Sequence, residues 1–247
     1  MAVKTSPAAS ATLASQTQSH SLPSSAAIQD YAKAIYVLAE RNDGPVGTSD
    51  LAARLAVSPA SVSAMIKRLS EMGIISHRPY RGVELTERGR RIALEVIRHH
   101  RLLELFLHET FGMPWDEVHD EAEVLEHVLS ERLEDLIAEK LGNPDFDPHG
   151  DPIPARDGTM VDHQHVSLGD LQIGAKGEFV RVSDAQPEIL RYLTAHNISP
   201  RMNFKITDRQ PFDGPLFVHF DGHGAPCVLG LRIAQAMRVV PVQGAAA

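Results

Sequence analysis

Residues 57–73 read Val-Ser-Pro-Ala-Ser-Val-Ser-Ala-Met-Ile-Lys-Arg-Leu-Ser-Glu-Met-Gly, and this stretch decides the fold of the first third of the chain. Proline is favoured in the first turn of a helix, and glycine is favoured just past its end. Pro59 and Gly73 therefore bound a helix that we predict over residues 60–72. Its first turn is small and polar, whereas Lys67 and Arg68 make its second half basic.

The elements around this helix are short and follow a definite order. Thr48 and Ser49 are expected to be N-caps of a short helix. Apolar periodicity and turn residues predict a helix over residues 28–39 that ends near 42–45, a second helix over 50–55, and strands at 74–77 and 83–85 around a basic loop. Helix, helix, turn, helix and hairpin is the order of a winged helix-turn-helix.

A helix that reads base edges needs small or polar residues at its start, with basic residues nearby for the phosphates. Taken singly, each such residue here is equally consistent with ordinary capping or surface charge. Their ordered combination favours double-stranded DNA as a partner. The predicted DNA-binding residues are Thr48, Ser49, Ser58, Pro59, Ala60, Ser61, Ser63, Lys67, Arg68, Arg78 and Arg81.

A second informative stretch, residues 119–127, reads His-Asp-Glu-Ala-Glu-Val-Leu-Glu-His. On a helix, Glu123, Glu126 and His127 share one face, and a divalent ion would remove the repulsion between the carboxylates. A solvated acidic helix is the alternative interpretation. A second pair of potential ligands at helical spacing, His100 and Glu104, favours a metal-sensing protein.

Composition bounds these interpretations. The chain has 247 residues, of which 43% are hydrophobic, so we expect a buried core and two domains, with a third segment between them. The single cysteine excludes an internal disulfide, a cysteine-based zinc finger and an iron–sulfur cluster, and it suits a reducing cytosol. No apolar run approaches the length of a membrane span. Residues 1–23 are predicted to be a disordered tail.

The charge is unevenly distributed, although the chain as a whole carries −8. Residues 28–101 hold 12 Lys and Arg against 8 Asp and Glu, a net of +4. Residues 102–157 hold 3 against 16, a net of −13. The basic part therefore coincides with the predicted DNA reader, and the acidic part carries most of the potential metal ligands.

The rest of the chain changes character at residues 143–158, which are rich in Pro, Gly and Asp and predict a linker. Before them we predict two helices, over residues 90–111 and 115–141. After them, short β-like runs with one helix over residues 187–195 predict a small barrel-like β domain.

Several motifs together resemble the diphtheria-toxin-repressor and manganese-transport-regulator family of metal-dependent repressors. The matching positions are Asp30-Tyr31 with Tyr36, residues 55–73, Tyr80-Arg81-Gly82-Val83 with Leu85-Thr86 and Gly89, His100-Arg101-Leu102 with Glu104, and Val118-His119-Asp120-Glu121-Ala122 with Glu126-His127. Residues 147–154 resemble the family's hinge into a C-terminal SH3-like (FeoA-like) domain. The resemblance covers residues 24–245.

The resemblance implies a mainly α N-terminal part followed by a small SH3-like β-barrel. It implies a winged helix-turn-helix at 24–97, a helical metal-binding and dimerisation domain at 98–145, a linker at 146–160 and an SH3-like domain at 161–244. It also implies a homodimer that binds a palindromic operator when metal is bound. The protein is then cytoplasmic, binds no membrane and no small organic substrate, and is not an enzyme.

The resemblance also implies ligands. The primary site would consist of Asp30, Glu123, Glu126 and His127, and the second of His100, Glu104 and His119. Asp147 and His149 lie where some manganese-type members supply ligands. Asp184, Gln186 and Glu188 lie near a stretch from which the SH3-like domain donates a ligand in some relatives, without a choice among them. We expect His99, beside His100, to be a surface residue.

The metal is expected to be Mn(II), with Fe(II) as the alternative and Zn(II) or Co(II) as substitutes in vitro. Iron-type members usually have Met at the position of Asp30 and Cys at that of Glu123. Short manganese regulators have an acidic ligand where this chain has Lys33, so we expect separate rather than bridged sites. Without metal, repulsion among Asp30, Glu123 and Glu126 is expected to loosen the first helix.

The resulting hypothesis is a Mn(II)-activated repressor of metal uptake and homeostasis. An Fe(II)-responsive regulator of the same family is the alternative within the class. A metallohydrolase is disfavoured because the sequence has no HExxH motif and no nucleophile constellation. A winged-helix protein that binds an organic ligand would leave the grouped His, Asp and Glu residues unexplained.

Overall fold

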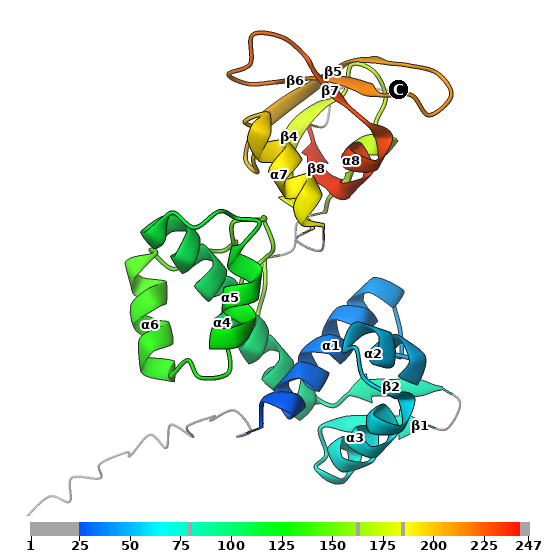
Figure 1. The fold of residues 1–247 in the computed structure, drawn as a ribbon, viewed down its shortest axis with the longest axis vertical. Helices are drawn as coiled ribbons and strands as arrows, with labels where there is room; N and C mark the ends of the chain where they lie inside the picture. The colour runs from blue at the N-terminus through cyan, green and yellow to red at the C-terminus, as the bar shows by residue number, and fades with distance from the viewer. Residues whose placement is uncertain (1–24, 79–80, 162–163, 184–185, 243–247) are drawn as a thin grey trace, which may run out of the picture.

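The computed structural model describes residues 25–78, 81–161, 164–183 and 186–242, so the predicted tail at 1–23 lies outside the described residues. Figure 1 shows three groups of elements, which follow one another along the chain: a helical group with a small hairpin, a second helical group, and a β-sheet flanked by short helices. Among the helices described, none is both long and apolar enough to cross a membrane.

The first group has the predicted order of a winged helix-turn-helix. It contains α1 (Ala26–Asn42), α2 (Thr48–Arg54), α3 (Pro59–Glu71), β1 (Ile75–Arg78) and β2 (Gly82–Leu85), and the two strands pair antiparallel. Its core is almost entirely aliphatic, and the fully buried side chains include Ile35, Leu51, Leu69 and Ile74. The fold class predicted for this part is thereby confirmed.

The ends of α3 follow from local chemistry, but the start of α2 corrects a prediction. Ser58 caps α3 by accepting a hydrogen bond from the backbone N–H of Ser61, with proline at the first helical position. The expectation that Thr48 and Ser49 are N-caps was wrong, because Gly47 occupies the N-cap position. Val46 is held in a β-bridge with Val83, so the chain turns into the helix directly after it.

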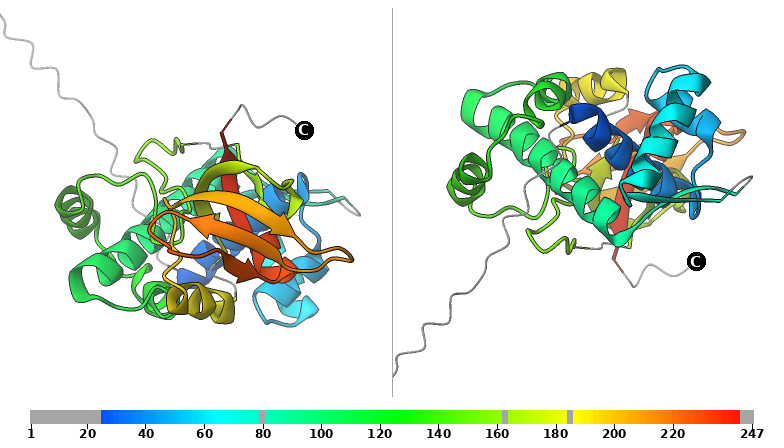
Figure 2. Two further views of the ribbon diagram at one scale, coloured as in Figure 1. Left: turned by 90° about the horizontal axis from the view of Figure 1, so that it is seen from above. Right: turned by 90° about the horizontal axis from the view of Figure 1, so that it is seen from below.

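Helix α4 (Glu87–Phe111) connects the first two groups. It begins at Thr86, whose hydroxyl accepts from the Gly89 N–H, and ends at Gly112 with a φ of 68°. Its first half packs in the core of the winged helix and its second half in a separate apolar core. Figure 2, seen from below, shows α1 beside α4. The helix runs unbroken through residues 97 and 98, where we placed a domain boundary, and that division stays a prediction.

The predicted helix over residues 115–141 was wrong as a single element. The structure has α5 (Val118–Leu125) and α6 (Glu131–Lys140), with a turn between them. Ser130 caps α6, and the backbone carbonyl of Glu126 contacts Nδ1 of His99 at 3.1 Å. These two contacts stabilise a break that the apolar spacing of residues 115–141 does not reveal.

The C-terminal group is a small antiparallel β domain, as predicted. Its elements are β3 (Val166–Ser167), the 3-10 turn η1 (Leu168–Asp170), β4 (Lys176–Val182), α7 (Pro187–Ala195), β5 (Asn203–Arg209), β6 (Leu216–Phe220), β7 (Cys227–Leu229), α8 (Leu231–Ala236) and β8 (Met237–Pro241). The strand order is β3-β8-β4-β5-β6-β7. The helix predicted over residues 187–195 is α7, whereas η1, β7 and α8, which are three, three and six residues long, were not foreseen.

The β domain contacts the second helical group through Trp115 and the segment after α6. The Trp115 indole N–H donates to the Thr194 hydroxyl at 2.6 Å, and its ring packs into the core of the β domain. The Val182 N–H donates to the His149 carbonyl at 2.9 Å. Gly150 has a φ of 86° and lies so close to the Val180 carbonyl that a side chain would collide with it. The last two contacts hold residues 149 and 150 against β4.

Candidate metal centre

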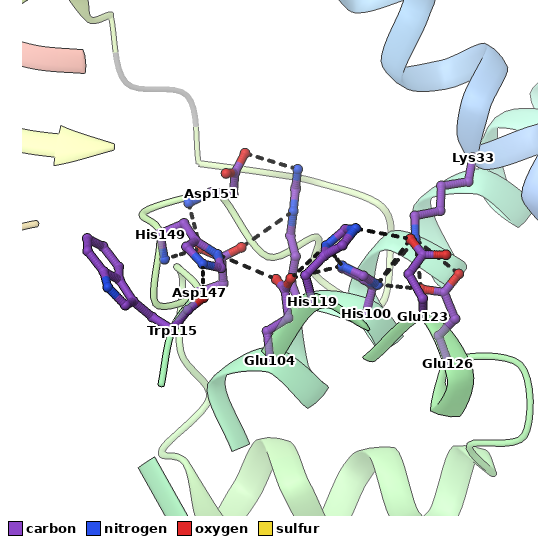
Figure 3. A network of polar contacts seen from close by, with 11 residues as sticks. Lys33, His100, Glu104, Trp115, His119, Glu123, Glu126, Asp147, His149 and Asp151 are labelled. Carbon is purple, nitrogen blue, oxygen red and sulfur yellow. Dashed lines mark hydrogen bonds and ion pairs between the residues drawn. The ribbon is translucent and has the colours of Figure 1, made fainter. Parts of the chain in front are cut away.

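Potential metal ligands gather along one face of α4, between α1, α5 and the segment after α6 (Figure 3). Within the described residues, three groups each place ligand-capable atoms within 4.8 Å of one another. The groups are Asp30, Glu126 and His127; His100, His119 and Glu123; and Glu104, Asp147 and His149. All nine predicted ligands are therefore brought into these groups, but Glu123 and Glu104 fall in groups other than those predicted.

The first group joins α1 to the turn after α5. His127 Nε2 lies 2.9 Å from Asp30 Oδ1 and 3.6 Å from Glu126 Oε1. The other ring nitrogen of His127 lies 2.6 Å from the amide oxygen of Gln29, which fixes the ring. Burial raises the pKa of the Asp30 carboxyl, and the nearby Glu126 and Glu123 raise it further against the effect of His127. This arrangement suits a cation shared between α1 and α5.

The second group is centred on His100 of α4. Its Nδ1 lies 2.5 Å from Glu126 Oε2, and its Nε2 lies 3.0 Å from Glu104 Oε1 and 3.1 Å from His119 Nδ1. Burial alone would lower the pKa of His100, but the hydrogen bonds to the Glu104 and Glu126 carboxylates raise it. Burial would raise the pKa of Glu104, but its hydrogen bonds with His100 and His119 lower it. His100 thus connects the first group to the third.

The third group is the most enclosed, and one of its atoms is positioned for a ligand. His149 Nε2 lies 2.7 Å from the Trp115 carbonyl, so it must carry the proton that the carbonyl accepts. The other ring nitrogen, Nδ1, is buried and has no hydrogen-bond partner among the described residues. It lies 3.8 Å from Glu104 Oε2. A buried imidazole oriented by a carbonyl is a usual arrangement for a metal ligand.

Asp147 completes the third group under unfavourable electrostatics. Burial raises the pKa of its carboxyl well above the usual range, and the neighbouring Asp151 and Glu104 raise it further, against Arg101. One Asp147 oxygen also accepts from the backbone N–H groups of His149 and Asp151. A cation would relieve the repulsion between these carboxylates. The donors of all three groups therefore fit a divalent metal ion.

Lys33 of α1 is the residue that sequence reasoning misjudged most. Its Nζ lies 2.6 Å from Glu123 Oε1, 2.7 Å from Glu126 Oε2 and 3.2 Å from His100 Nδ1. Burial raises the pKa of the Glu123 carboxyl, but Lys33, together with His100 and His119, outweighs burial and the net shift is downward. The repulsion predicted between Glu123 and Glu126 is thus not unrelieved, because one ammonium from α1 lies between the two carboxylates and offsets part of their charge. The sequence signal was Lys33 itself, three residues after Asp30.

His99 was also misjudged, since it is buried rather than a surface residue. Its Nε2 lies 3.2 Å from Glu134 Oε2 on α6, and Glu134 is also paired with Arg98. Burial would lower the pKa of His99, but the contact with Glu134 raises it. Burial would raise the pKa of Glu134, but the contacts with His99 and Arg98 lower it. Because α4 packs against α1, α5 and α6, the consecutive residues His99 and His100, which point about 100° apart around the helix, are both buried.

The predicted DNA-binding residues lie on the exposed side of α2 and α3. Helix α3 buries Val62, Ile66 and Leu69, and the predicted contacts on its other faces are exposed. Thr48, Ser63 and Lys67 line one surface hollow, which brings the start of α2 next to the middle of α3. The exposed predicted residues are Thr48, Ser49, Ser58, Pro59, Ala60, Ser61, Ser63, Lys67, Arg68 and Arg81, while Arg78 is the last residue of β1.

The structure does not choose among Asp184, Gln186 and Glu188 as a metal ligand from the SH3-like domain. Asp184 lies outside the described residues. Gln186 accepts a hydrogen bond from Arg232, and the exposed Glu188 lies 3.9 Å from Arg191. Neither Gln186 nor Glu188 belongs to the three groups formed by the described residues.

Comparisons with known proteins agree with this architecture. Three family models match successive parts of the chain: the N-terminal DNA-binding domain of iron-dependent repressors at residues 24–83, their metal-binding and dimerisation domain at 86–155, and the FeoA domain at 166–241. These matches follow the order of the three groups of elements.

Individual relatives extend the match. The chain is 37% identical over 224 residues to the diphtheria toxin repressor of Corynebacterium glutamicum, covering 87% of this chain and 96% of that protein. It is 41% identical to the iron-dependent repressor IdeR of Mycobacterium tuberculosis over 124 residues, which span only 54% of that protein. A solved manganese-dependent transcriptional repressor in complex with manganese is 44% identical, with a TM-score of 0.79, covering 87% of this chain and all of that one.

The fold and site define a DNA-binding regulator with a metal-sensing helical domain, a class of transcriptional repressors and not of enzymes. The chain belongs to the diphtheria-toxin-repressor family of metal-dependent repressors.

Proposed function

We propose that this protein is a Mn(II)-activated transcriptional repressor that controls metal uptake and homeostasis. The observation that carries the proposal is the convergence of Asp30 from α1 with Glu126 and His127 from the turn after α5. Because α1 packs in the core that holds the reader helix α3, a contact at Asp30 acts on the position of α3 relative to the second helical group.

A bound divalent ion would supply the charge that joins the carboxylates of α1 and α5. Asp30 contributes the ligand from the reader domain, while Glu126 and His127 contribute those from the acidic domain. We assign Glu123 to this primary site as well, on the resemblance. His100, Glu104 and His119 form the second site, and Asp147 and His149 extend it. The two sites then differ in role: the primary one is the switch, and the second braces α4 against the segment that leads to the β domain.

The choice of Mn(II) rests on the donors. The three groups contain carboxylates and imidazoles alone, and hard oxygen donors suit Mn(II) better than softer ions. A relative named as a manganese-dependent repressor supports this choice. An Fe(II)-responsive regulator is the second candidate, because other relatives are named as iron-dependent repressors. The lysine at position 33 supports separate rather than bridged sites.

We propose a homodimer that binds a palindromic operator in the cytoplasm. Exposed apolar side chains on and beside α5 and α6, namely Val124, Val128, Leu133 and Leu136, support a dimer through this face. A two-fold dimer presents two copies of α3 to half-sites about 34 Å apart, one turn of DNA. The exposed residues of α2 and α3, with Arg78 and Arg81, would make the contacts. The domain limits stay those implied by the resemblance.

The test of metal identity is operator binding titrated separately with Mn(II), Fe(II), Zn(II) and Co(II), with bound metal counted. We expect Mn(II) to give the strongest activation, and we expect the activated protein to contain two or more metal ions per chain. Exchanging Asp30→Met together with Glu123→Cys should shift activation toward Fe(II). If Fe(II) activates the unaltered protein best, the iron-responsive alternative holds instead.

A further inference from the structure

The primary site contains a cation of its own, the ammonium of Lys33. Its Nζ lies within hydrogen-bond distance of both oxygens of Glu126, at 2.7 and 3.0 Å, and of Glu123 Oε1 at 2.6 Å. Figure 3 shows the side chain reaching from α1 to a point between the two carboxylates. The Lys33 side chain is 11% exposed and that of Glu126 is fully buried.

The contact between Lys33 and Glu126 joins α1 to the C-terminal end of α5, the same two segments that the primary site joins. Lys33 lies on α1, one turn after Asp30, and Glu126 directly follows α5 as its C-cap. An enclosed carboxylate without a partner is strongly unfavourable, so the ammonium stabilises the docking of α1 on α5. Glu126 Oε1, the oxygen that lies 3.6 Å from His127 Nε2 in the primary site, is 3.0 Å from Lys33 Nζ, so the ammonium contacts an oxygen that a metal would need.

We propose that Lys33 is an internal competitor for the primary site: its ammonium holds Glu123 and Glu126 while no metal is bound, and it must leave them when they become ligands. The inference rests on the proposed function, since it assumes that these carboxylates bind metal. It follows that Lys33 lowers the metal affinity and keeps the metal-free chain folded, so the metal concentration at which the protein responds depends on this residue.

The first experiment measures Mn(II) affinity by calorimetry in the full chain and in Lys33→Gln, with Lys205→Gln as the control. Lys205 is an exposed lysine on β5, so its replacement removes the same charge away from the site. The primary site is identified as the one that Glu126→Gln abolishes. We expect Lys33→Gln to tighten it at least tenfold, which is about 1.4 kcal/mol. The metal-free variant should also melt at a lower temperature, and saturation with Mn(II) should remove the difference.

The second experiment uses the unaltered protein and so does not depend on a variant that folds. An amine-acetylating reagent is applied with chelator or with Mn(II), and labelling is located by mass spectrometry. Acetylation of Lys33 should be slow without metal and should rise severalfold with Mn(II), whereas acetylation of the reference Lys205 should not change.

Each outcome separates this inference from the proposed function. An unaltered protein that binds Mn(II), with equal or weaker binding in Lys33→Gln, would overturn the competitor role and leave the repressor proposal standing. Lys33 labelling that stays slow in Mn(II) would overturn it as well. Mn(II) binding that appears only in Lys33→Gln would support the competitor and contradict the repressor. No binding in either protein would overturn both.

Discussion

Replacing Glu126 with glutamine is the sharpest perturbation of the switch. The side chain is fully buried and contacts Lys33 of α1, His100 of α4 and the neighbouring His127. Glutamine keeps the shape but removes the charge. Breaking a buried ion pair costs about 3–5 kcal/mol. We expect the lower end, about 3 kcal/mol, because the half-exposed Glu123 still holds Lys33 at 2.6 Å.

For a chain of this size, 1 kcal/mol shifts the melting temperature by about 2–4 °C. The metal-free Glu126→Gln protein should therefore melt roughly 6–12 °C lower than the unaltered one. Its operator affinity should no longer respond to Mn(II), whereas the unaltered protein should gain about 5–150-fold, the usual range of an allosteric coupling.

The assay is fluorescence anisotropy of an operator fragment, in chelator and over a Mn(II) series, with thermal unfolding measured in parallel. Glu121→Gln is the matched control, because it removes a carboxylate from the exposed side of α5. The reasoning is refuted if Glu126→Gln retains the full Mn(II) response. It is also refuted if Glu121→Gln loses that response to the same degree.

Other parts of the molecule give three further predictions. Glu104→Ala should leave a repressor that still responds, but at higher Mn(II), because Glu104 belongs to the bracing site; a Mn(II) titration of operator binding measures this. Replacing Lys67 and Arg68 by alanine should flatten the salt dependence of DNA binding by about 0.9 in the log–log slope for each phosphate that the variant no longer neutralises. Glu134→Gln should destabilise the protein most between pH 4.5 and pH 6.5, which are the ordinary pKa values of Glu134 and of its partner His99; melting temperatures measured over a range of pH test this.

The sign of the pH effect follows from the two shifts. The lowered pKa of Glu134 stabilises the folded chain above pH 4.5, and this is lost as pH falls through the folded value. The raised pKa of His99 stabilises it below pH 6.5, and this is lost as pH rises. A loss of stability in Glu134→Gln that is equal from pH 4 to 8 would contradict the pairing.

An inactive Glu104→Ala protein would reverse the roles of the two sites. A salt slope that is unchanged when Lys67 and Arg68 are replaced would mean that α3 is not the reader helix.

Much of the fold could be predicted because its signals are local. Ser58, Pro59 and Gly73 mark the ends of α3 through capping and backbone preference, which act within one turn. The break between α5 and α6 escaped prediction because it depends on His99 contacting the Glu126 carbonyl, 27 residues away. Apolar spacing cannot report such a contact.

The residues of the candidate site likewise divide into those that local sequence patterns could predict and those that depend on tertiary packing. The spacing of Glu123, Glu126 and His127 indicated a shared face, and the family resemblance added Asp30, Asp147 and His149. Neither approach placed Lys33 between Glu123 and Glu126, because the lysine lies 90 residues from Glu123 and its partner is set by the packing of α1 on α4 and α5. A basic residue one turn from a ligand could have indicated a competing cation.

The most direct test of the central claim is the affinity of the unaltered protein for one operator fragment, measured first in chelator, then with Mn(II), then after chelator is added back. A metal-switched repressor should bind tightly only in the Mn(II) step and release the fragment when the metal is removed. Equal affinity in all three steps would contradict the claim that metal at Asp30, Glu126 and His127 controls the reader helix.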